Sequence, residues 1–334
     1  RYACLRTVFE VGRILKIIEK SAFSKTNCKR IKSLISRDFA VNISMITEVK
    51  MKIQYWGTAA AEGVPSVFCN CPTCREAREK GGRFIRARAQ ALINDDLLVD
   101  FGPDTYQSAL ERGYNLADLG YVLITHTHAD HFTPTELHNR QIGFSHGMKY
   151  ETLNFYGSTD MVERYYDYMA GNGAYLLEQK RVGLNVIEPY NTYDVNGYKI
   201  TPLPATHGTR HPFVYIIEKD GKTIFYCNDS GYPKPPVLDW LGKCGKKFDL
   251  VSYDCTHGDM DPVEQWGENA SHMGVKRNII LRDKLRESGL YKPGTVDIIT
   301  HYSHNGVSVG YDDITRIAKE NGFIAAYDGM TVEI

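Results

Sequence analysis

The residues best suited to chemistry form the stretch His-Thr-His-Ala-Asp-His that begins at His126. Four of its six side chains are metal ligands, and a packed core requires none of them. The apolar run 120–124 comes directly before it and indicates a buried strand that ends at the stretch. Alternate side chains of an extended segment point the same way, so His126 and His128 can bind one cation. Asp130 and His131, at the turn, can reach a second, and the pattern predicts a two-metal hydrolase.

Three later strand-like runs also end in candidate ligands, which are His207, Asp229 and His301. Ligands at strand ends are held by a rigid sheet while one side stays open to substrate. His211 lies four residues beyond His207 and competes for the same role, but we favour His207 because it directly follows its run. Asp100 also ends a strand-like run. We expect it to orient a metal ligand from behind, the alternative being a carboxylate that caps the following turn.

A second metal site is indicated by Cys69, Cys71 and Cys74, which crowd into six residues. A disulfide between such near neighbours would be strained, whereas three thiolates and one further ligand make a closed tetrahedral zinc site. His304 is the best candidate for the fourth ligand, and the alternative is three unrelated buried thiols. The other five cysteines have no such grouping, and eight in 334 residues are too few for a disulfide scaffold. We therefore expect metal binding and a reducing cytoplasm.

The composition is ordinary for a globular protein, with 43% hydrophobic and 24% charged residues. We expect neither a signal peptide nor a membrane partner, because no apolar run is long enough to cross a bilayer. Residues 1–50 carry 11 Lys and Arg against 4 Asp and Glu, a charge of +7, which the remainder balances with −7. The acidic main body argues against a nucleic-acid partner, which would favour a basic track.

The sequence predicts two parts, 1–50 and 51–334. The first has apolar residues at roughly helical spacing. It is either a small helical appendage that binds DNA or an upstream extension before a natural start at Met51. In the second part short apolar runs alternate with helical stretches, which indicates an α/β sandwich whose first strand begins near Met51. The further expected strands are 90–99, 120–125, 198–203, 213–218, 222–227, 248–253, 295–300 and 323–327, and the expected helices are 104–112, 159–170, 274–287 and 312–320.

These motifs resemble those of the metallo-β-lactamase superfamily, whose fold is an αββα sandwich of two mixed sheets flanked by helices. The resemblance covers residues 51–334 and rests on the His-x-His-x-Asp-His block, the run before Asp100, and the later His, Asp and His in the expected order. It implies that Asp229 bridges two divalent cations, of zinc or manganese, with iron as a further option. The other implied ligands are His126, His128 and His207 for metal 1, and Asp130, His131 and His301 for metal 2.

The cysteine cluster and the late Thr-His-x-x-His sequence narrow the resemblance. They resemble the phosphodiesterase branch typified by the cyclic ribosyl phosphate phosphodiesterase of phosphonate breakdown, the carbon–phosphorus lyase pathway. There the thiolates and the last His hold a structural zinc, which antibiotic-degrading β-lactamases lack. The segment after His131 and the Tyr- and Gly-rich segment 145–180 depart from that branch, so the exact substrate does not carry over.

The resemblance also implies a mechanism, in which two cations sharing Asp229 lower the pKa of a bridging water to near ~7. The resulting hydroxide attacks phosphorus in line, and the metals offset the charge that develops on the phosphoryl oxygens. We also expect Asp130 to take part in catalysis. His272 matches a late non-ligand His of related phosphodiesterases and is expected to be a general acid or a donor to phosphate, unless it merely bonds backbone at a helix start. The resemblance places Asp254 and His257 near the pocket without assigning a role, and either is a candidate to support a metal ligand from behind.

The favoured function is therefore a dinuclear metal phosphodiesterase acting on a small phosphate ester, with cyclic esters included. A thioester or lactone hydrolase of the same fold is the enzymatic alternative, and a tRNA-trimming nuclease fits the acidic body less well. The non-enzymatic alternative is a regulator that binds nucleic acid through residues 1–50. The sequence leaves a homodimer open.

Overall fold

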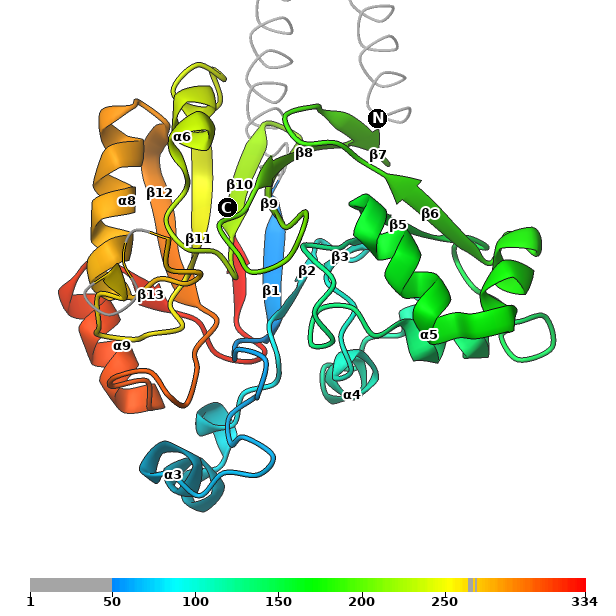
Figure 1. Ribbon diagram of the computed structural model, residues 1–334, viewed down its shortest axis with the longest axis horizontal. Coiled ribbons are helices and arrows are strands. Elements are labelled where there is room, and N and C mark those ends of the chain that lie inside the picture. The colour runs from blue at the N-terminus through cyan, green and yellow to red at the C-terminus, as the bar shows by residue number, and fades with distance from the viewer. Residues whose placement is uncertain (1–49, 264–266, 268) are drawn as a thin grey trace, which may run out of the picture. The chain divides into compact units, whose positions relative to one another are not determined.

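The computed structural model describes residues 50–263, 267 and 269–334. The helical extension expected over residues 1–50 falls, apart from Lys50, outside the described residues. In the described part, two mixed sheets of seven strands each lie between outer helices (Figure 1). The expected αββα sandwich is therefore confirmed. None of the described helices combines the length and apolarity that a bilayer span requires.

The first sheet is parallel from β3 to β6 and antiparallel over its other strands. In sheet order its strands are β14 (Thr331–Glu333), β1 (Lys52–Gly57), β2 (Gln90–Ile93), β3 (Leu97–Val99), β4 (Tyr121–Leu123), β5 (Leu153–Gly157) and β6 (Val182–Val186). The second sheet is parallel from β10 to β13. Its strands are β13 (Ile324–Ala325), β12 (Tyr291–Thr300), β11 (Phe248–Asp254), β10 (Lys222–Cys227), β9 (Phe213–Lys219), β8 (Tyr198–Pro204) and β7 (Tyr193–Val195).

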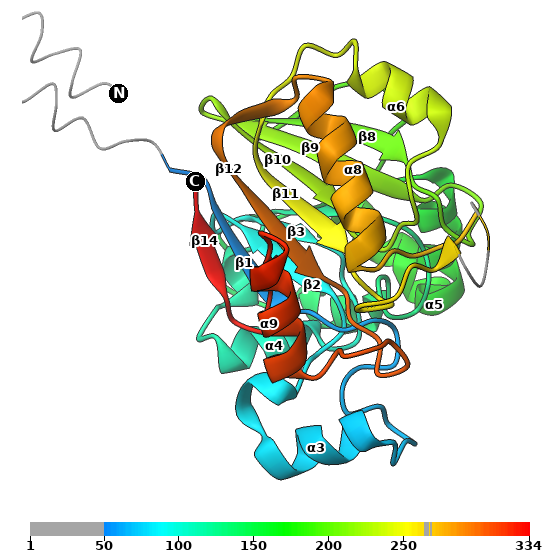
Figure 2. The ribbon, with the colours of Figure 1, turned by 90° about the vertical axis from the view of Figure 1, so that its left-hand side faces the viewer.

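Helices cover the outer faces, with α8 and α9 beside the second sheet and α4 and α5 beside the first (Figures 1 and 2). The α-helices are α3 (Pro72–Lys80), α4 (Thr105–Glu111), α5 (Thr159–Glu178), α6 (Pro235–Leu241), α8 (Val275–Glu287) and α9 (Tyr311–Glu320). The described part also contains three 3₁₀ helices, η1 (Gly82–Phe84), η2 (Leu116–Asp118) and η3 (Pro134–Arg140).

The core has three apolar layers, and strand periodicity explains them. In β10, Ile224 and Tyr226 belong to the cluster between the sheets, whereas Phe225 and Cys227 belong to the cluster that includes the outer helices. A third cluster joins the outer face of the first sheet to α5, as shown by Phe155 of β5. Both faces of these strands are buried, so they read as continuous apolar runs in the sequence.

Two expected elements differ most from the structure. The run 90–99, expected as one strand, is a hairpin of β2 and β3. The chain reverses at Asn94, which has a left-handed backbone (φ 51°), a conformation that Asn tolerates. The helix expected over 159–170 continues to Glu178, although Ala170 (φ 43°) interrupts its regular backbone. The short helices α3 and α6, each with Pro in its first turn, and strands β5, β6, β7 and β14 were not predicted.

The parallel strands place the candidate site. Asp100 follows β3, Asp229 follows β10 after one residue, and His301 follows β12. The carboxyl ends of parallel neighbours meet at one edge of a sheet, where ligand sites of α/β proteins form. All three residues have left-handed backbones, with φ of 68°, 50° and 65° respectively. That conformation is uncommon for residues other than Gly and concentrates at functional sites.

Gly102 brings the backbone after β3 against the histidine loop. A Cβ at this position would lie 1.9 Å from the Asp130 carbonyl oxygen. The contact is fixed on either side, because Phe101 N–H donates to His131 O at 2.8 Å and Thr133 N–H donates to Phe101 O at 2.9 Å. A side chain at Gly102 must therefore displace the loop that carries the predicted ligands.

We predict that Gly102→Ala lowers the free energy of unfolding by on the order of 1–3 kcal/mol, through overpacking, and reduces the metal content. Thermal unfolding and elemental analysis measure the two effects. Gly171→Ala is the matched control, because Gly171 lies in α5 with nothing near its Cβ position and should be neutral or slightly stabilised. Equal behaviour of the two variants would show that the close approach is unimportant.

Candidate metal centres

The first group of ligand atoms comes from three histidines. His128 Nδ1 lies 3.0 Å from His126 Nε2 and 3.1 Å from His207 Nε2. Two nitrogens bound to one tetrahedral zinc at roughly 2.0–2.1 Å lie ~3.3 Å apart. The three rings are therefore spaced to share one cation, with all their ligand atoms within 4.8 Å of one another.

The second group consists of Asp130, His131, Asp229 and His301, all of them buried. His131 Nε2 lies 2.8 Å from Asp130 Oδ2 and also 2.8 Å from Asp229 Oδ2. His301 Nε2 lies 3.5 Å from the same Asp229 oxygen. These atoms converge from the histidine loop, the end of β10 and the end of β12, so residues far apart in the sequence form one buried donor set.

Asp229 joins the two groups. Its Oδ2 atom also lies 3.3 Å from His126 Nε2, and its Oδ1 atom lies 3.2 Å from His207 Nδ1. A single carboxylate thus contacts histidines of both groups. This is the position that a bridging ligand requires.

Buried polar atoms without a hydrogen bond indicate whether cations fit these two ligand groups. His131 Nε2, His301 Nε2 and Asp229 Oδ1 are buried and make no hydrogen bond, since their close contacts lack hydrogen-bond geometry. Leaving such a group unsatisfied costs about 1–3 kcal/mol, and coordination by a cation would satisfy it. Imidazole and carboxylate donors together suit zinc, manganese or iron. The residues present therefore fit a pair of divalent cations.

Burial also favours neutral rings in the first group. It lowers the pKa of His126 well below the usual value, with help from the neighbouring His131, and it lowers the pKa of His207. A neutral imidazole offers a lone pair to a metal, whereas a protonated one does not. The environment thus holds these two side chains in the form that binds metal.

Asp100 lies where the sequence predicted a group behind the ligands. Its Oδ2 atom is 2.7 Å from His131 Nδ1, which leaves His131 Nε2 for a metal. Thr125 donates to Asp100 Oδ1 through its backbone N–H and its hydroxyl, at 2.8 and 2.9 Å. A carboxylate on the far nitrogen fixes the tautomer and the ring orientation of a ligand histidine.

Asp254 occupies the equivalent position behind His301 and His272. Its Oδ2 atom lies 3.1 Å from His272 Nδ1 and 3.3 Å from His301 Nδ1, while Thr256 Oγ1 is 2.8 Å from His301 Nδ1. Its Oδ1 atom accepts from Met273 N–H at 2.8 Å. Asp254 is fully buried, so these contacts orient two imidazoles at the edge of the centre.

His272 lies beside both ligand groups, with its ring stacked on His301 (centroids 5.6 Å apart) and 5.1 Å from His207. Its Nδ1 faces Asp254, so Nε2 is the ring atom left for a substrate. Burial lowers the pKa of His272, but Asp254 outweighs it and raises the pKa above the usual value. His272 also forms a ligand-like group with Asp229, Asp254 and His301.

His211 and His257 differ from the histidines above in their surroundings. His211 is 56% exposed, and its Nδ1 lies 3.1 Å from Asp160 Oδ1. The structure thus brings His207 rather than His211 to the first group. His257 packs beside His272 at a centroid distance of 5.9 Å, and burial lowers its pKa.

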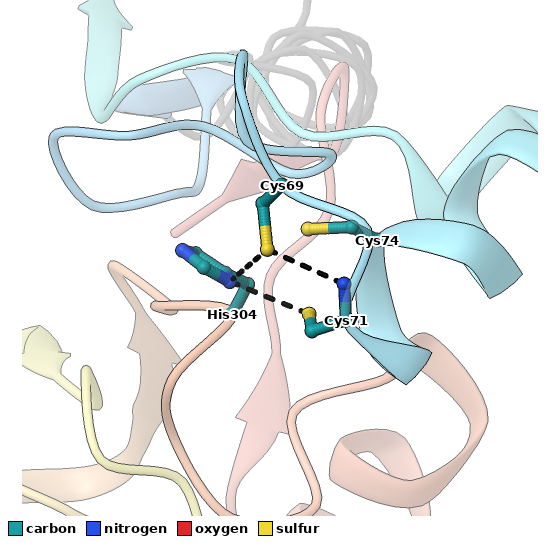
Figure 3. Close-up of side chains that lie close together, drawn as sticks. All are labelled: Cys69, Cys71, Cys74 and His304. Atoms are coloured by element: carbon teal, nitrogen blue, oxygen red, sulfur yellow. Dashed lines mark hydrogen bonds between the residues drawn. The ribbon is translucent and has the colours of Figure 1, made fainter.

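The three clustered cysteines meet His304 (Figure 3). His304 Nδ1 lies 3.5 Å from Cys69 Sγ and 3.4 Å from Cys71 Sγ. Sulfur and nitrogen ligands of one tetrahedral zinc, at roughly 2.3 and 2.05 Å, are ~3.5 Å apart. Burial raises the pKa of Cys71, but hydrogen bonds from the Cys74 backbone and from His304 outweigh it and lower the pKa to about 6. The four residues therefore fit a closed zinc site.

Two residues near this cluster were missed by sequence reasoning. Arg78, on α3, donates to Cys69 O at 2.7 Å, to Asn70 Oδ1 at 3.2 Å and to Ser66 O at 3.2 Å, and so holds the cysteine loop. Its position one helical turn after Cys74 was the available signal. Glu62 accepts a hydrogen bond from Ser303 Oγ, and no local pattern pointed to it.

A cavity of about 370 Å³ opens beside His207. Its wall includes Thr209, Arg210, His211 and Lys234, so hydroxyl and cationic groups face it. The volume suits a small ligand. A larger cavity of about 530 Å³, lined by Phe101 and Leu137 among others, includes none of the proposed ligands in its wall, so cavity size alone does not identify the site.

Comparison with known proteins agrees with this geometry. The beta-lactamase superfamily domain matches residues 96–291, more than half of the 334-residue chain. No curated protein matches the sequence.

Several solved structures share the fold. A diphosphatase from the PhnP family is 18% identical with a TM-score of 0.64, covering 86% of this chain and 98% of its own. Zn²⁺-bound PqqB from Methylobacterium extorquens is 19% identical with a TM-score of 0.64, covering 85% and 100%. The short form of human tRNase Z is 16% identical with a TM-score of 0.53, covering 84% and 98%. At these identities the likeness concerns the fold.

We predict that Cys71→Ser loses about one zinc per chain and lowers the unfolding temperature, because three ligands hold a structural zinc poorly. The His and Asp centre should stay at least partly loaded. Elemental analysis and thermal unfolding measure both effects. Cys244→Ser is the control, since Cys244 lies outside the cluster. Unchanged zinc stoichiometry in Cys71→Ser would remove the assignment.

Proposed function

The chain belongs to the beta-lactamase superfamily, and from this premise we propose that it is a dinuclear metal-dependent phosphodiesterase acting on small phosphate esters, cyclic diesters included. The observation that carries the proposal is the Asp229 carboxylate, which contacts histidines of two adjacent ligand groups. That arrangement suits in-line displacement at phosphorus, in which charge develops on both the attacking and the leaving oxygen.

The residues that would hold the cations follow from these contacts. His126, His128 and His207 would bind one ion, Asp130, His131 and His301 the other, and Asp229 both. When bound, such a pair supplies Lewis acidity toward the phosphoryl oxygens and brings the pKa of water toward ~7. Asp100 and Asp254 keep the metal-facing nitrogens of His131 and His301 directed inward.

Asp130 supplies negative charge on the attacking side. Burial raises its pKa, but His131 outweighs this effect and lowers the pKa below the usual value, so the side chain stays ionised. It can accept a hydrogen bond from the attacking water and fix its direction toward phosphorus. We propose this role for Asp130 in addition to that of a ligand.

His272 supplies the proton on the leaving side. Its Nδ1–H faces the buried Asp254 carboxylate, which fixes the ring and favours the protonated form. The Nε2–H is then available to the departing alkoxide. Asp254 thus acts through His272, as a positioning residue.

Two observations favour phosphate esters over thioesters and lactones. The cavity beside His207 has Lys234 in its wall, and this cation suits an anionic substrate, whereas Arg210 of the same wall is paired with Asp160 and Glu163. The fold is shared by a protein named as a diphosphatase and by one named as a tRNase, and both names denote hydrolysis at phosphorus. A structural zinc on the thiolate cluster completes the proposal, and unbridged thiolates suit a reducing compartment such as the cytoplasm.

The proposed function is tested by metal analysis combined with a substrate panel. Freshly purified protein should contain about three metal ions per chain and hydrolyse bis-nitrophenyl phosphate faster than a thioester or a lactone. Chelation should abolish turnover, and added Zn²⁺ or Mn²⁺ should restore it. Preferential thioester or lactone turnover would reject the phosphodiesterase in favour of that alternative.

We predict that His272→Ala slows diesters with alkoxide leaving groups by roughly 10²–10⁴-fold, because an alkoxide needs a proton as it departs. Nitrophenyl esters should be affected much less, since nitrophenolate is a stable anion. Initial rates on matched alkyl and nitrophenyl esters measure the difference. His146→Ala is the control on an exposed loop. Equal losses on both ester types would exclude the acid role.

A further inference from the structure

The two metal centres share one short turn. His301, in the second ligand group, and His304, in the thiolate cluster, are three residues apart after β12. We infer that the thiolate cluster, with Glu62, acts as a positioning device for His301, so that the two centres are coupled through turn 301–304. The inference rests on the metal-binding part of the proposed function. It adds that the binding of one ion at the His and Asp centre depends on the thiolate cluster.

The backbone of His301 requires external support. Its φ of 65° lies in the left-handed region, which residues other than Gly rarely adopt. Such conformations persist only where the surrounding structure holds them. On the N-terminal side the support is β12, which pairs with β11 and β13. On the C-terminal side it must come from residues 302–304, so their contacts decide where the His301 imidazole points.

Residues 302 and 303 are fixed to two other segments. Tyr302 N–H donates to Thr58 O at 2.8 Å, and Tyr302 O accepts from Ala60 N–H at 2.9 Å. Ser303 N–H donates to Thr256 O at 3.2 Å. The turn is therefore attached to the segment after β1, which leads through Glu62 toward the cysteines.

Glu62 contacts both of the last two residues of the turn. Its carboxylate accepts a hydrogen bond from Ser303 Oγ, and its Oε1 atom lies 3.7 Å from His304 Nε2. His304 Nδ1 faces Cys69 and Cys71, as Figure 3 shows. The hydrogen-bond contact of His304 Nε2 is with Asn305 Nδ2 at 3.4 Å, so Glu62 acts on His304 through its nearby negative charge. Glu62 thus holds Ser303 in the turn by a hydrogen bond and lies beside the ring of His304.

The coupling has a direction. Loss of the His304 anchor would leave the turn held by the backbone hydrogen bonds of Tyr302 and Ser303 alone. We expect His301 to shift as a result, and His301 belongs to the second ligand group rather than the first. His126, His128 and His207 lie on other loops, and their hydrogen bonds within the described residues lead to Thr125, to Ser271 and to one another. The cation held by Asp130, His131 and His301 should therefore weaken, while the other is retained.

Zinc release tests the inference without any substrate. Zinc-loaded protein is mixed with a chromophoric chelator, and the release of each ion is followed for wild type, Glu62→Ala and Glu62→Gln. Glu62→Ala should release one ion of the His and Asp centre roughly 10-fold faster or more, within the 10–100-fold range of losses of orienting groups. Glu62→Gln keeps an acceptor for Ser303 and should show a smaller effect.

Glu79→Ala is the matched control, because Glu79 is an exposed carboxylate on α3. Co²⁺ substitution gives an independent readout, since thiolate ligation produces a charge-transfer band that Glu62→Ala should weaken or shift. Should Glu62→Ala fail to fold, Ser303→Ala removes the same hydrogen bond and serves in its place.

Release kinetics and a Co²⁺ spectrum identical to those of Glu79→Ala would overturn the coupling. Faster release of both ions by the same factor would also contradict it, because that result indicates general loosening rather than displacement of His301. These outcomes are distinct from failure of the proposed function. A wild-type protein that binds its metals but hydrolyses no diester would reject the activity and leave the coupling intact.

Discussion

The buried Asp229 carboxylate is the interaction on which the rest of this site depends. It contacts His126, His131, His207 and His301 within 3.5 Å, and these histidines arrive from distant parts of the chain. An unpaired charge in such surroundings would be strongly unfavourable. Cations bound by the surrounding imidazoles would pair with this carboxylate and make its burial favourable. Metal binding can thus offset the electrostatic cost of burying Asp229.

The strand ends and the left-handed residues beside them determine where the side chains of the site lie. Parallel strands in each sheet deliver their last residues to one edge, and a left-handed backbone at Asp100, Asp229 and His301 turns the chain immediately afterwards. Gly102 has no side chain, so the backbone after β3 can lie directly against the loop that carries Asp130. The rigid sheets thus fix the ligand atoms, while the loops provide the cavity beside His207.

Much of the fold and of the candidate site was predictable, because periodicity and ligand spacing are local properties. Strand β10 matches its expected bounds, and residue type and spacing were enough to group the three cysteines with His304. The hairpin at Asn94 was missed, because one left-handed residue breaks a run that reads as continuous. Short elements such as α6 were missed because a seven-residue helix carries little periodicity. Glu62 was missed because its partner Ser303 lies far away in the sequence. Arg78 was missed because it donates to backbone carbonyls, which every residue has.

The sequence by itself determined which side chains can bind metal, their order along the chain and the family they resemble, since these follow from residue type and spacing. The choice between His207 and His211 needed tertiary structure, because both follow the same strand and only their three-dimensional positions differ. Tertiary structure also decided that Asp254 faces His272 and His301 together, and that one turn joins the thiolates to the His and Asp centre. Such contacts depend on how distant segments pack, and no local pattern in the chain encodes that packing.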